Sequence, residues 1–203
     1  MIKAPVILGF DTASGHCAVS IVQGERILAE TVEDMRKGQA ERLMGIVTQT
    51  LNDASVTLDQ LEGIGVGVGP GNFTGIRIAV SAARGLALGL GVPSIGISAF
   101  DALQLGFTGS CTTTVDARQN QIYVQDFEDN GAGTAPRLVG LDQFAARYPV
   151  IGVGGMSAKY PVAVAIALLA AKRLEGPQAR PAPLYIRPAD AAPARDAPPK
   201  ILS

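Results

Sequence analysis

A glycine-rich strand that leads into a long apolar helix is the feature that most limits how this chain can fold. The stretch GVGVGPGNFTGIRIAVSAARGLALGLG covers residues 65–91. Its first part predicts a buried strand over 64–68, and its later part predicts a helix over 74–90. The glycine-proline-glycine sequence at 69–71 predicts a tight turn between them. A strand that turns directly into a helix is typical of α/β proteins.

The turn is a candidate anion site at the start of this helix. Successive backbone N–H groups near a helix N-terminus attract phosphates, and Asn and Thr are residue types that cap helices. The loop has neither the Gly-Lys-Ser/Thr of a P-loop nor a dinucleotide fingerprint. The alternative is a turn that only fixes where the helix begins. The candidate phosphate-binding residues here are Gly69, Gly71, Asn72, Thr74 and Gly75.

A second candidate phosphate loop follows the first predicted strand, over 5–10. Asp11, Thr12 and Ser14 place a carboxylate and two hydroxyls at the end of that strand. Such a group can hold a phosphate or a metal-bound water. The simpler alternative is that Asp11 caps a turn while the two hydroxyls bond to loop amides.

Three charged residues are candidates for ion pairs. Arg77 lies in the first turn of the helix, where a cation opposes the helix dipole. It therefore points to an anion or a carboxylate partner such as Asp11, unless it faces solvent. Asp116 and Arg118 stand together at the end of a strand predicted over 111–118, with Tyr123 further on. They could form a functional site, but a structural ion pair that orders a hinge is the favoured interpretation.

The order of strands and acidic residues predicts two related lobes. A strand that ends in an acid and continues into a hairpin occurs at Asp11 and again at Asp116. We therefore expect an N-terminal lobe over 1–106 and a smaller C-terminal lobe with a Pro/Ala-rich tail over 107–203. Further elements are predicted as helices over 38–52, 141–148 and 161–174, a short capped helix over 57–61, and a docking strand within PLYIRP, residues 183–188.

The helix over 74–90 is apolar around almost its whole circumference, which predicts burial on all sides. Its own sheet can cover one face. Either the helix over 38–52 covers the other, or both helices form a contact surface for another protein; we favour the second interpretation. Gly85 and Gly89 would let a further helix approach closely. The candidate interface residues are Ala40, Leu43, Met44, Val47 and Leu51 in the first helix, and Ile76, Ala79, Val80, Ala83, Leu86, Ala87 and Leu90 in the second.

Charge and composition exclude several functions. The formal net charge is −1 and no Lys/Arg run exceeds two residues, so we expect no nucleic-acid contact except through a partner. His16 is the only histidine, so neither a metallopeptidase site nor serine-histidine catalysis is supported. The two cysteines, Cys17 and Cys111, are expected to be free and buried. We expect no signal peptide, no membrane span and a cytoplasmic location.

Four segments, in this order, resemble the TsaB (YeaZ) family: ILGFDTAS, GVGPGNFTGIRIAVSAARGLALGLGVPSIGISAFDAL, VDARQNQIYVQDF and LYIRP. The resemblance implies a two-lobed actin-like/Hsp70-like ATPase fold of the ribonuclease H-like type, with mixed sheets flanked by helices. It also implies a non-catalytic subunit that binds and activates the catalytic subunit TsaD. The reaction is N6-threonylcarbamoylation of adenosine 37 in tRNAs that read ANN codons. The ATPase TsaE is an implied further partner, and a homodimer is expected when partners are absent.

By position, the resemblance implies interface helices over about 39–52 and 74–90, and a first phosphate loop at Asp11 and Thr12. It implies no metal and no required cofactor, although an adenine nucleotide could bind weakly or at a subunit junction. The chain departs from the family in having no histidine near residues 38–39. Its short second lobe also puts in doubt a C-terminal helix that packs back on the first lobe.

A free-standing nucleotide phosphotransferase or hydrolase of the same fold is the alternative function. Such an enzyme needs a second glycine-rich phosphate loop in the second lobe. The segment that follows the second strand-end acid is Asp116-Ala117-Arg118-Gln119, which contains no glycine. The sequence therefore favours the non-catalytic subunit.

Overall fold

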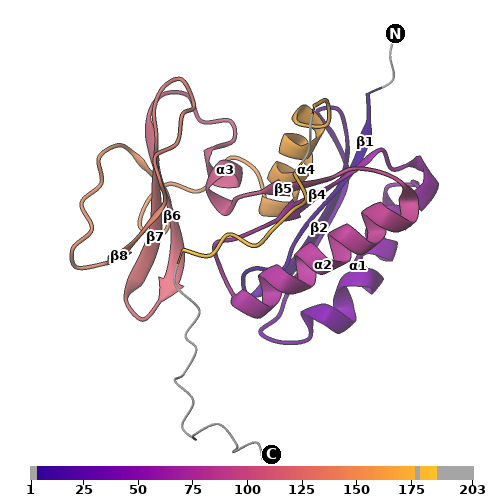
Figure 1. Ribbon diagram of the computed structural model, residues 1–203, viewed down its shortest axis with the longest axis horizontal. Coiled ribbons are helices and arrows are strands. Elements are labelled where there is room, and N and C mark those ends of the chain that lie inside the picture. The colour runs from indigo at the N-terminus through magenta and orange to yellow at the C-terminus, as the bar shows by residue number, and fades with distance from the viewer. Residues whose placement is uncertain (1–3, 177–178, 187–203) are drawn as a thin grey trace, which may run out of the picture.

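Two separate β-sheets divide the protein into two lobes, which lie side by side in Figure 1. The computed structural model describes residues 4–176 and 179–186. The first sheet has the strand order β3-β2-β1-β4-β5, and the second has the order β8-β7-β6-β9. The strands of the first sheet are β1 (Val6–Asp11), β2 (His16–Gln23), β3 (Arg26–Asp34), β4 (Gly63–Gly67) and β5 (Ser94–Ile97). Those of the second are β6 (Cys111–Arg118), β7 (Gln121–Phe127), β8 (Arg137–Gly140) and β9 (Val150–Gly152).

The two sheets repeat one topology. In the first, β1 pairs antiparallel with β2 on one side and parallel with β4 on the other. In the second, β6 pairs antiparallel with β7 and parallel with β9. The strand, acid and hairpin pattern of the sequence thus corresponds to equivalent strands, with Asp11 at the end of β1 and Asp116 near the end of β6.

Three helices cover the two faces of the first sheet (Figure 1). Helices α1 (Gln39–Asp53) and α2 (Phe73–Leu90) share a core with Leu8 and Phe10 of β1. Helix α4 (Val162–Lys172) packs on the opposite face, where Ile7 points. Successive residues of β1 therefore contribute to different cores, as expected of a strand buried on both faces.

The return of α4 to the first sheet corrects two expectations from the sequence. The second lobe does not run without a break from 107 onward, and a helix after it does pack back on the first lobe. Two glycines of the first sheet allow α4 to pack on it closely. A Cβ atom at Gly9 would lie 2.6 Å from the Ala167 Cβ, and one at Gly65 would lie 2.8 Å from the Ala170 Cβ. These strands accept a helix of small apolar residues at very short range.

The short helix α3 (Ala99–Gln104) connects the two lobes. Its N-cap is Ser98, whose hydroxyl accepts a hydrogen bond from the Asp101 backbone N–H. Phe100 is buried in the core of the second lobe, whereas Ala102 is buried in the cluster with α4. The two lobes are therefore joined by a packed element.

The helix predicted over 141–148 does not form, and the segment consists of turns. Contacts to the second sheet hold its two ends. The Leu141 N–H donates to the Asn120 carbonyl, and the Tyr148 N–H donates to the Thr112 hydroxyl. Bonds to the sheet replace the i to i−4 bonds that a helix would need, so tertiary contacts override the local preference.

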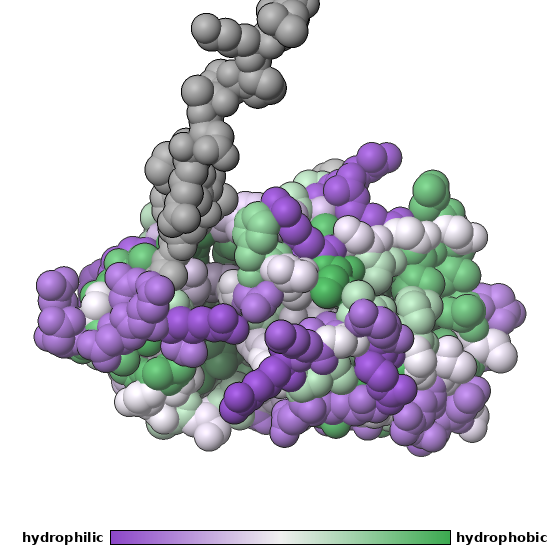
Figure 2. Space-filling view, turned by 90° about the horizontal axis from the view of Figure 1, so that it is seen from below, coloured by the Kyte–Doolittle hydropathy of each residue, from purple (hydrophilic) through white to green (hydrophobic). Residues whose placement is uncertain are grey.

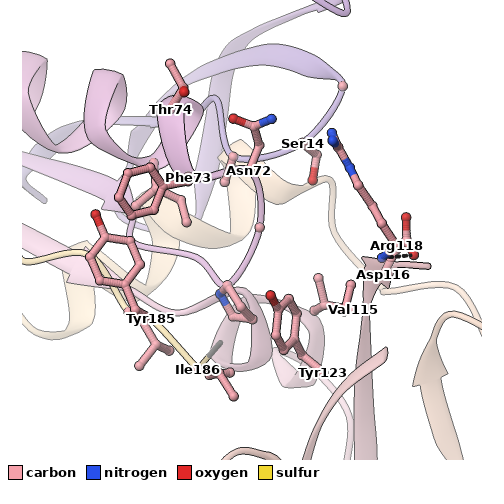
Figure 3. A pocket seen from close by; sticks show the side chains of 17 residues that line it. Ser14, Asn72, Phe73, Thr74, Val115, Asp116, Arg118, Tyr123, Tyr185 and Ile186 are labelled. Atoms are coloured by element: carbon pink, nitrogen blue, oxygen red, sulfur yellow. Dashed lines mark hydrogen bonds between the residues drawn. The ribbon is translucent and has the colours of Figure 1, made fainter. Parts of the chain in front are cut away.

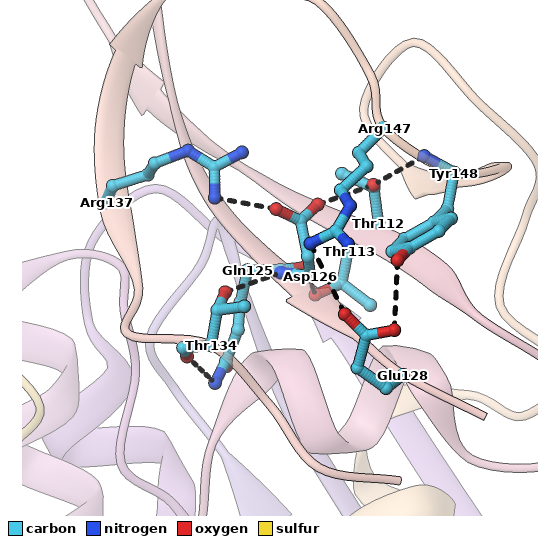
Figure 4. A network of polar contacts seen from close by, with 9 residues as sticks. All are labelled: Thr112, Thr113, Gln125, Asp126, Glu128, Thr134, Arg137, Arg147 and Tyr148. Atoms are coloured by element: carbon cyan, nitrogen blue, oxygen red, sulfur yellow. Dashed lines mark hydrogen bonds and ion pairs between the residues drawn. The ribbon is translucent and has the colours of Figure 1, made fainter. Parts of the chain in front are cut away.

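A polar network occupies the neighbourhood of this segment (Figure 4). Asp126 is buried and accepts hydrogen bonds from the Thr112 hydroxyl at 2.6 Å and from Arg137 at 2.8 Å. Glu128 accepts the Tyr148 hydroxyl at 2.9 Å and lies 3.3 Å from Arg147. Because the buried carboxylate has both a hydroxyl and a guanidinium partner, the network satisfies the groups it buries.

Both ends of α2 carry the expected caps. The Asn72 side-chain oxygen accepts the Gly75 N–H at 3.0 Å, and Gly91 ends the helix with a φ of 67°. By length and composition alone α2 could cross a bilayer, although the sequence predicted no span. One of its faces packs on the first sheet. The short 3-10 helix η1 (Leu58–Gln60) has Thr57 as its N-cap, with a capping box to Gln60.

Both cysteines are free and buried, as the sequence predicted. Cys17 lies in the core of the first lobe and Cys111 in that of the second. Burial raises the pKa of the Cys17 thiol to about 11, so the reactive thiolate is scarce at neutral pH.

Candidate functional site

A cavity of about 540 Å³ lies between the two lobes (Figure 3). Four segments line it: the loop after β1, the start of α2, the end of β6 with Tyr123 of β7, and the segment over 184–186. Of the candidate phosphate-binding residues, Ser14, Gly71, Asn72 and Thr74 line this cavity. The structure therefore brings half of the two predicted loops to one site.

Asp11 and Thr12 do not line the cavity, and both are buried. The Asp11 Oδ2 atom accepts the Ala13 N–H at 3.0 Å and lies 3.0 Å from His16 Nε2. The Thr12 hydroxyl donates to the Gly75 carbonyl at 2.6 Å. The simpler alternative, a turn cap, describes Asp11, while Thr12 ties the loop after β1 to α2.

The glycines of the second loop allow two backbones to meet. A Cβ atom at Gly75 would lie 1.9 Å from the Thr12 carbonyl oxygen, and one at Gly71 would lie 2.4 Å from the Ala13 carbonyl oxygen. Gly69 has a φ of +93°, which favours glycine, and neither it nor Gly75 lines the cavity. Close loop packing accounts for these residues without a bound phosphate.

Arg77 is exposed, as one of the alternatives from the sequence had it, and its partners are aromatic residues and not the carboxylate of Asp11. Its guanidinium lies 3.7 Å from the centre of the Phe73 ring, and its Nε donates to the Tyr185 hydroxyl at 2.9 Å. The Phe73 and Tyr185 rings stack with centroids 4.9 Å apart. These three residues fix the segment over 184–186 against the start of α2. Asp11, the partner expected for Arg77, bonds to His16 instead, and this hydrogen bond raises the His16 pKa.

Asp116 and Arg118 do not form the predicted ion pair. The Asp116 Oδ1 atom accepts the backbone N–H of Arg118 at 2.9 Å, and no contact between the two charged groups occurs in the described chain. Arg118, Gln119 and Asn120 all have a positive φ and make the turn into β7. In Figure 3 the Arg118 side chain extends toward Ser14, along the rim of the cavity.

Most of the candidate interface residues lie in the first lobe's own core, so their assignment to a contact surface is wrong. The other interpretation, that these residues belong to the protein's own core, applies. Helices α1 and α2 both pack against the first sheet, which removes these side chains from solvent. Leu86 and Leu90 are partly buried against the same core, whereas Ala40 and Met44 are exposed. The buried members are Leu43, Val47, Leu51, Ile76, Ala79, Val80, Ala83 and Ala87.

The exposed face of α2 carries different residues, which we call the α2 stripe. Leu88 is 85% exposed, and a Cβ atom at Gly85 or Gly89 would meet nothing within 4 Å. Figure 2 views the protein from below and shows hydrophobic residues gathered toward the N-terminal lobe among polar ones. The signal was present in the sequence, because the few polar residues of an apolar helix mark its solvent face. The α2 stripe consists of Arg77, Ser81, Arg84, Gly85, Leu88 and Gly89.

The sequence placed Tyr123 near the candidate pair Asp116 and Arg118, but it did not bring Phe73 and Tyr185 to the same site. Phe73 and Tyr185 lie far apart in the chain and stack only in the fold, and Tyr123 lies on β7 opposite Val115 of β6. The motifs GPGNF and LYIRP contain the first two but do not indicate which face each ring takes.

Across residues 4–176 and 179–186 no group of three or more His, Cys, Asp and Glu side chains is placed to hold a metal. The Ser14 hydroxyl lines the cavity, but the one histidine is bonded to Asp11. A nucleophile with an adjacent base is therefore not formed by the described side chains around the cavity.

Two mixed sheets of one topology, with flanking helices and a cavity between them, define an actin-like fold of two lobes. The sequence model of the family described as "TsaD: tRNA N6-adenosine threonylcarbamoyltransferase" matches residues 26–178. A crystal structure of an uncharacterized Pseudomonas aeruginosa protein, described as similar to the peptidase YeaZ, superposes with a TM-score of 0.74. It is 24% identical, and the match covers 90% of this chain and 100% of that one.

Curated relatives give the narrower assignment. The "tRNA threonylcarbamoyladenosine biosynthesis protein TsaB" of Bacillus subtilis is 32% identical over 120 residues, which cover 58% of this chain and 52% of the relative. The protein of the same name from Escherichia coli is 28% identical over 165 residues, which cover 73% of this chain and 71% of the relative. The chain spans about half the length of several curated relatives that it matches. It belongs to the TsaB (YeaZ) family.

Proposed function

We propose that this protein is a non-catalytic subunit that binds and activates a TsaD-type catalytic subunit. The reaction is N6-threonylcarbamoylation of adenosine 37 in tRNAs that read ANN codons. Family membership and the names of the TsaB relatives support the pathway. The side chains around the cavity, which pair no nucleophile with a base, support a role other than catalysis.

The single observation that carries the proposal is the α2 stripe. Leu88 is 85% exposed between two glycines whose Cβ positions are open. A large apolar side chain beside glycines lets a partner helix approach closely and cover it. Arg77 and Arg84 flank the apolar centre with positive charge, which suits a partner surface with carboxylates.

The other partners follow from the same proposal. TsaE joins the assembly of this protein with TsaD, and the α2 stripe pairs with its own copy when TsaD is absent. The tRNA is contacted only through partners, because the net charge of −1 supplies no basic stripe. This subunit requires no cofactor of its own, and it acts in the cytoplasm. The alternative is a free-standing phosphotransferase, which would need a glycine-rich phosphate loop after β6. We do not favour it, because Arg118, Gln119 and Asn120 form that turn and none of them is glycine.

Reconstitution tests the proposal. The purified chain is mixed with TsaD, TsaE and the enzyme that makes threonylcarbamoyl-adenylate, and tRNA modification is measured. Leu88→Glu should abolish binding to TsaD and reduce modification to the level seen without this protein. The matched control is Leu141→Glu, because Leu141 is 43% exposed in the second lobe. Thermal melts establish that both variants fold.

Two results would contradict the proposal, each in a different part. If modification runs equally well without this protein, the activating function is wrong. If Leu88→Glu binds TsaD as tightly as Leu141→Glu does, the function stands but the α2 stripe is not the contact surface.

A further inference from the structure

We propose that the cavity between the lobes binds a small organic anion with a ring or other apolar body and a single carboxylate or phosphate group. The proposal is independent of the proposed function, because it concerns the isolated chain. At about 540 Å³ the cavity has the size of a small-molecule site. Its walls combine apolar side chains with a few polar groups that converge on one space.

The Tyr123 hydroxyl is the first observation that points to a ligand. Tyr123 is only 7% exposed, and it lines the cavity. Figure 3 shows its hydroxyl directed into the cavity, away from the strand that holds it. The hydroxyl is open to the cavity and not sealed in the core, because no fully buried side-chain N or O atom of the described chain lacks a partner. It makes no hydrogen bond within the described chain. A ligand atom in the cavity would supply one.

The anion end is formed by the start of α2 together with Arg118. The Asn72 and Gly75 N–H groups are occupied by the Ala13 carbonyl and the Asn72 side chain. The N–H groups of Phe73 and Thr74, in contrast, have no acceptor among the described residues, and both residues line the cavity. Free N–H groups at a helix N-terminus attract an oxyanion.

Arg118 adds a positive charge on the facing lobe. No ion pair of its guanidinium occurs in the described chain, and its side chain extends across the rim toward Ser14 (Figure 3). Asp116 lies beside it as a negative charge on the same rim. One cation offset by one nearby carboxylate suits a single oxyanion and opposes a polyphosphate.

The remaining walls suit an apolar body. Ile76 of α2, Val115 of β6, and Leu184 and Ile186 of the 184–186 segment line the cavity from three segments, and Pro70 lines it just before α2. The 184–186 segment is held in place by the Leu184 N–H, which donates to the Val68 carbonyl at 2.8 Å. The apolar surface is therefore preformed, which lowers the entropic cost of binding.

Nuclear magnetic resonance titration of the full chain tests this site with four probes. Adenosine monophosphate and hippurate carry a ring with one phosphate or one carboxylate, and adenosine and hippuramide are their uncharged counterparts. At least one anion should bind saturably, with shifts of the Phe73 and Thr74 amide signals. The affinity for its uncharged counterpart should be lower by at least about tenfold. Binding of only one anion identifies phosphate or carboxylate as the preferred group.

Three variants place the binding in this cavity. Arg118→Gln removes the guanidinium charge but keeps a polar side chain, and Tyr123→Phe removes only the hydroxyl. Each should weaken binding several-fold, Arg118→Gln by about tenfold. Arg36→Gln, at an exposed position outside the cavity, should leave the affinity unchanged. If neither anion binds, or if Arg118→Gln and Tyr123→Phe bind like the unaltered protein, the proposal is wrong. Adenosine triphosphate that binds tenfold more tightly than the monophosphate would overturn the single-oxyanion part.

Discussion

The Thr12 hydroxyl donates a 2.6 Å hydrogen bond to the Gly75 carbonyl, which joins the loop after β1 to the first turn of α2. The bond is buried, and the backbone of Thr12 lies so close to Gly75 that no side chain fits between them. Two loops that the sequence presented as phosphate binders are thus packed on each other. The glycine-proline-glycine turn fixes the start of α2, and only its outer residues reach the cavity.

Replacement of Gly75 by alanine should destabilise the protein strongly. The new Cβ would lie 1.9 Å from the Thr12 carbonyl oxygen, which is backbone and cannot move without shifting β1 or α2. Overpacking of this kind costs about 1–3 kcal/mol. Gly85→Ala in the same helix is the matched control. Nothing lies within 4 Å of that Cβ, so helix propensity should stabilise the variant by up to about 1 kcal/mol. Thermal melts of both variants measure the difference, and equal changes in melting temperature would contradict this prediction.

Ala83→Glu should unfold or severely destabilise the protein, whereas Leu88→Glu should melt close to the unaltered chain. Ala83 is fully buried between the first sheet and α1, so a carboxylate there would have no solvent and no partner. Leu88 on the same helix is 85% exposed. Changes that bury an unpaired charge commonly cost more than about 3 kcal/mol, and surface changes stay near 0.5 kcal/mol. A folded Ala83→Glu protein with an unchanged melting temperature would show that α2 is not packed as described.

The bond between His16 and Asp11 should make stability depend on pH. The hydrogen bond that His16 donates to the Asp11 carboxylate raises the His16 pKa above its ordinary value of 6.5. A pKa raised in the folded state contributes stability that is fully present below 6.5 and is lost as the pH rises through the folded value. The stability difference between the unaltered protein and His16→Gln should therefore be larger at pH 5.5 than at pH 9. Denaturant titrations at both values measure it, and a difference that grows with pH would have the wrong sign.

The sequence identified local features well, because their causes are local. The cap at Asn72, the short helix capped by Thr57 and the strands β1, β4 and β6 each depend on residues close together in the chain. The assignment of Ala83 to a contact surface failed for a different reason. Periodicity shows that a helix is apolar, but not which other elements cover it. Here α2 shares one core with the first sheet and α1.

Long-range features could be read only in part. That α4 returns to Gly9 and Gly65 depends on the fit of a helix to a sheet face that is more than a hundred residues away in sequence. The strands carry glycines and α4 carries alanines, which permit close contact, but small residues do not specify which element they contact. The cavity was harder still to predict from the sequence, because Tyr123 is one of several alternating residues of a strand. Only the fold places its hydroxyl opposite the start of α2.

The aromatic contact of Tyr185 should control how firmly the 184–186 segment is held. Tyr185→Ala removes the stack on Phe73, together with the hydrogen bond and the ring contact from Arg77. The Leu184 N–H bond to the Val68 carbonyl should then open more often. Amide hydrogen exchange should become faster at Leu184, by about tenfold if the lost contacts are worth 1–1.5 kcal/mol.

Tyr160→Ala is the control for this variant, because Tyr160 packs near α4 and away from the segment. Exchange at Ile64, whose N–H donates to the Pro93 carbonyl in the first sheet, should stay the same in Tyr185→Ala. Faster exchange at both Leu184 and Ile64 would mean that the substitution loosens the whole lobe. Unchanged exchange at Leu184 would mean that the aromatic stack does not hold the segment, and that Leu184 and Ile186 keep it in place through the second lobe's core.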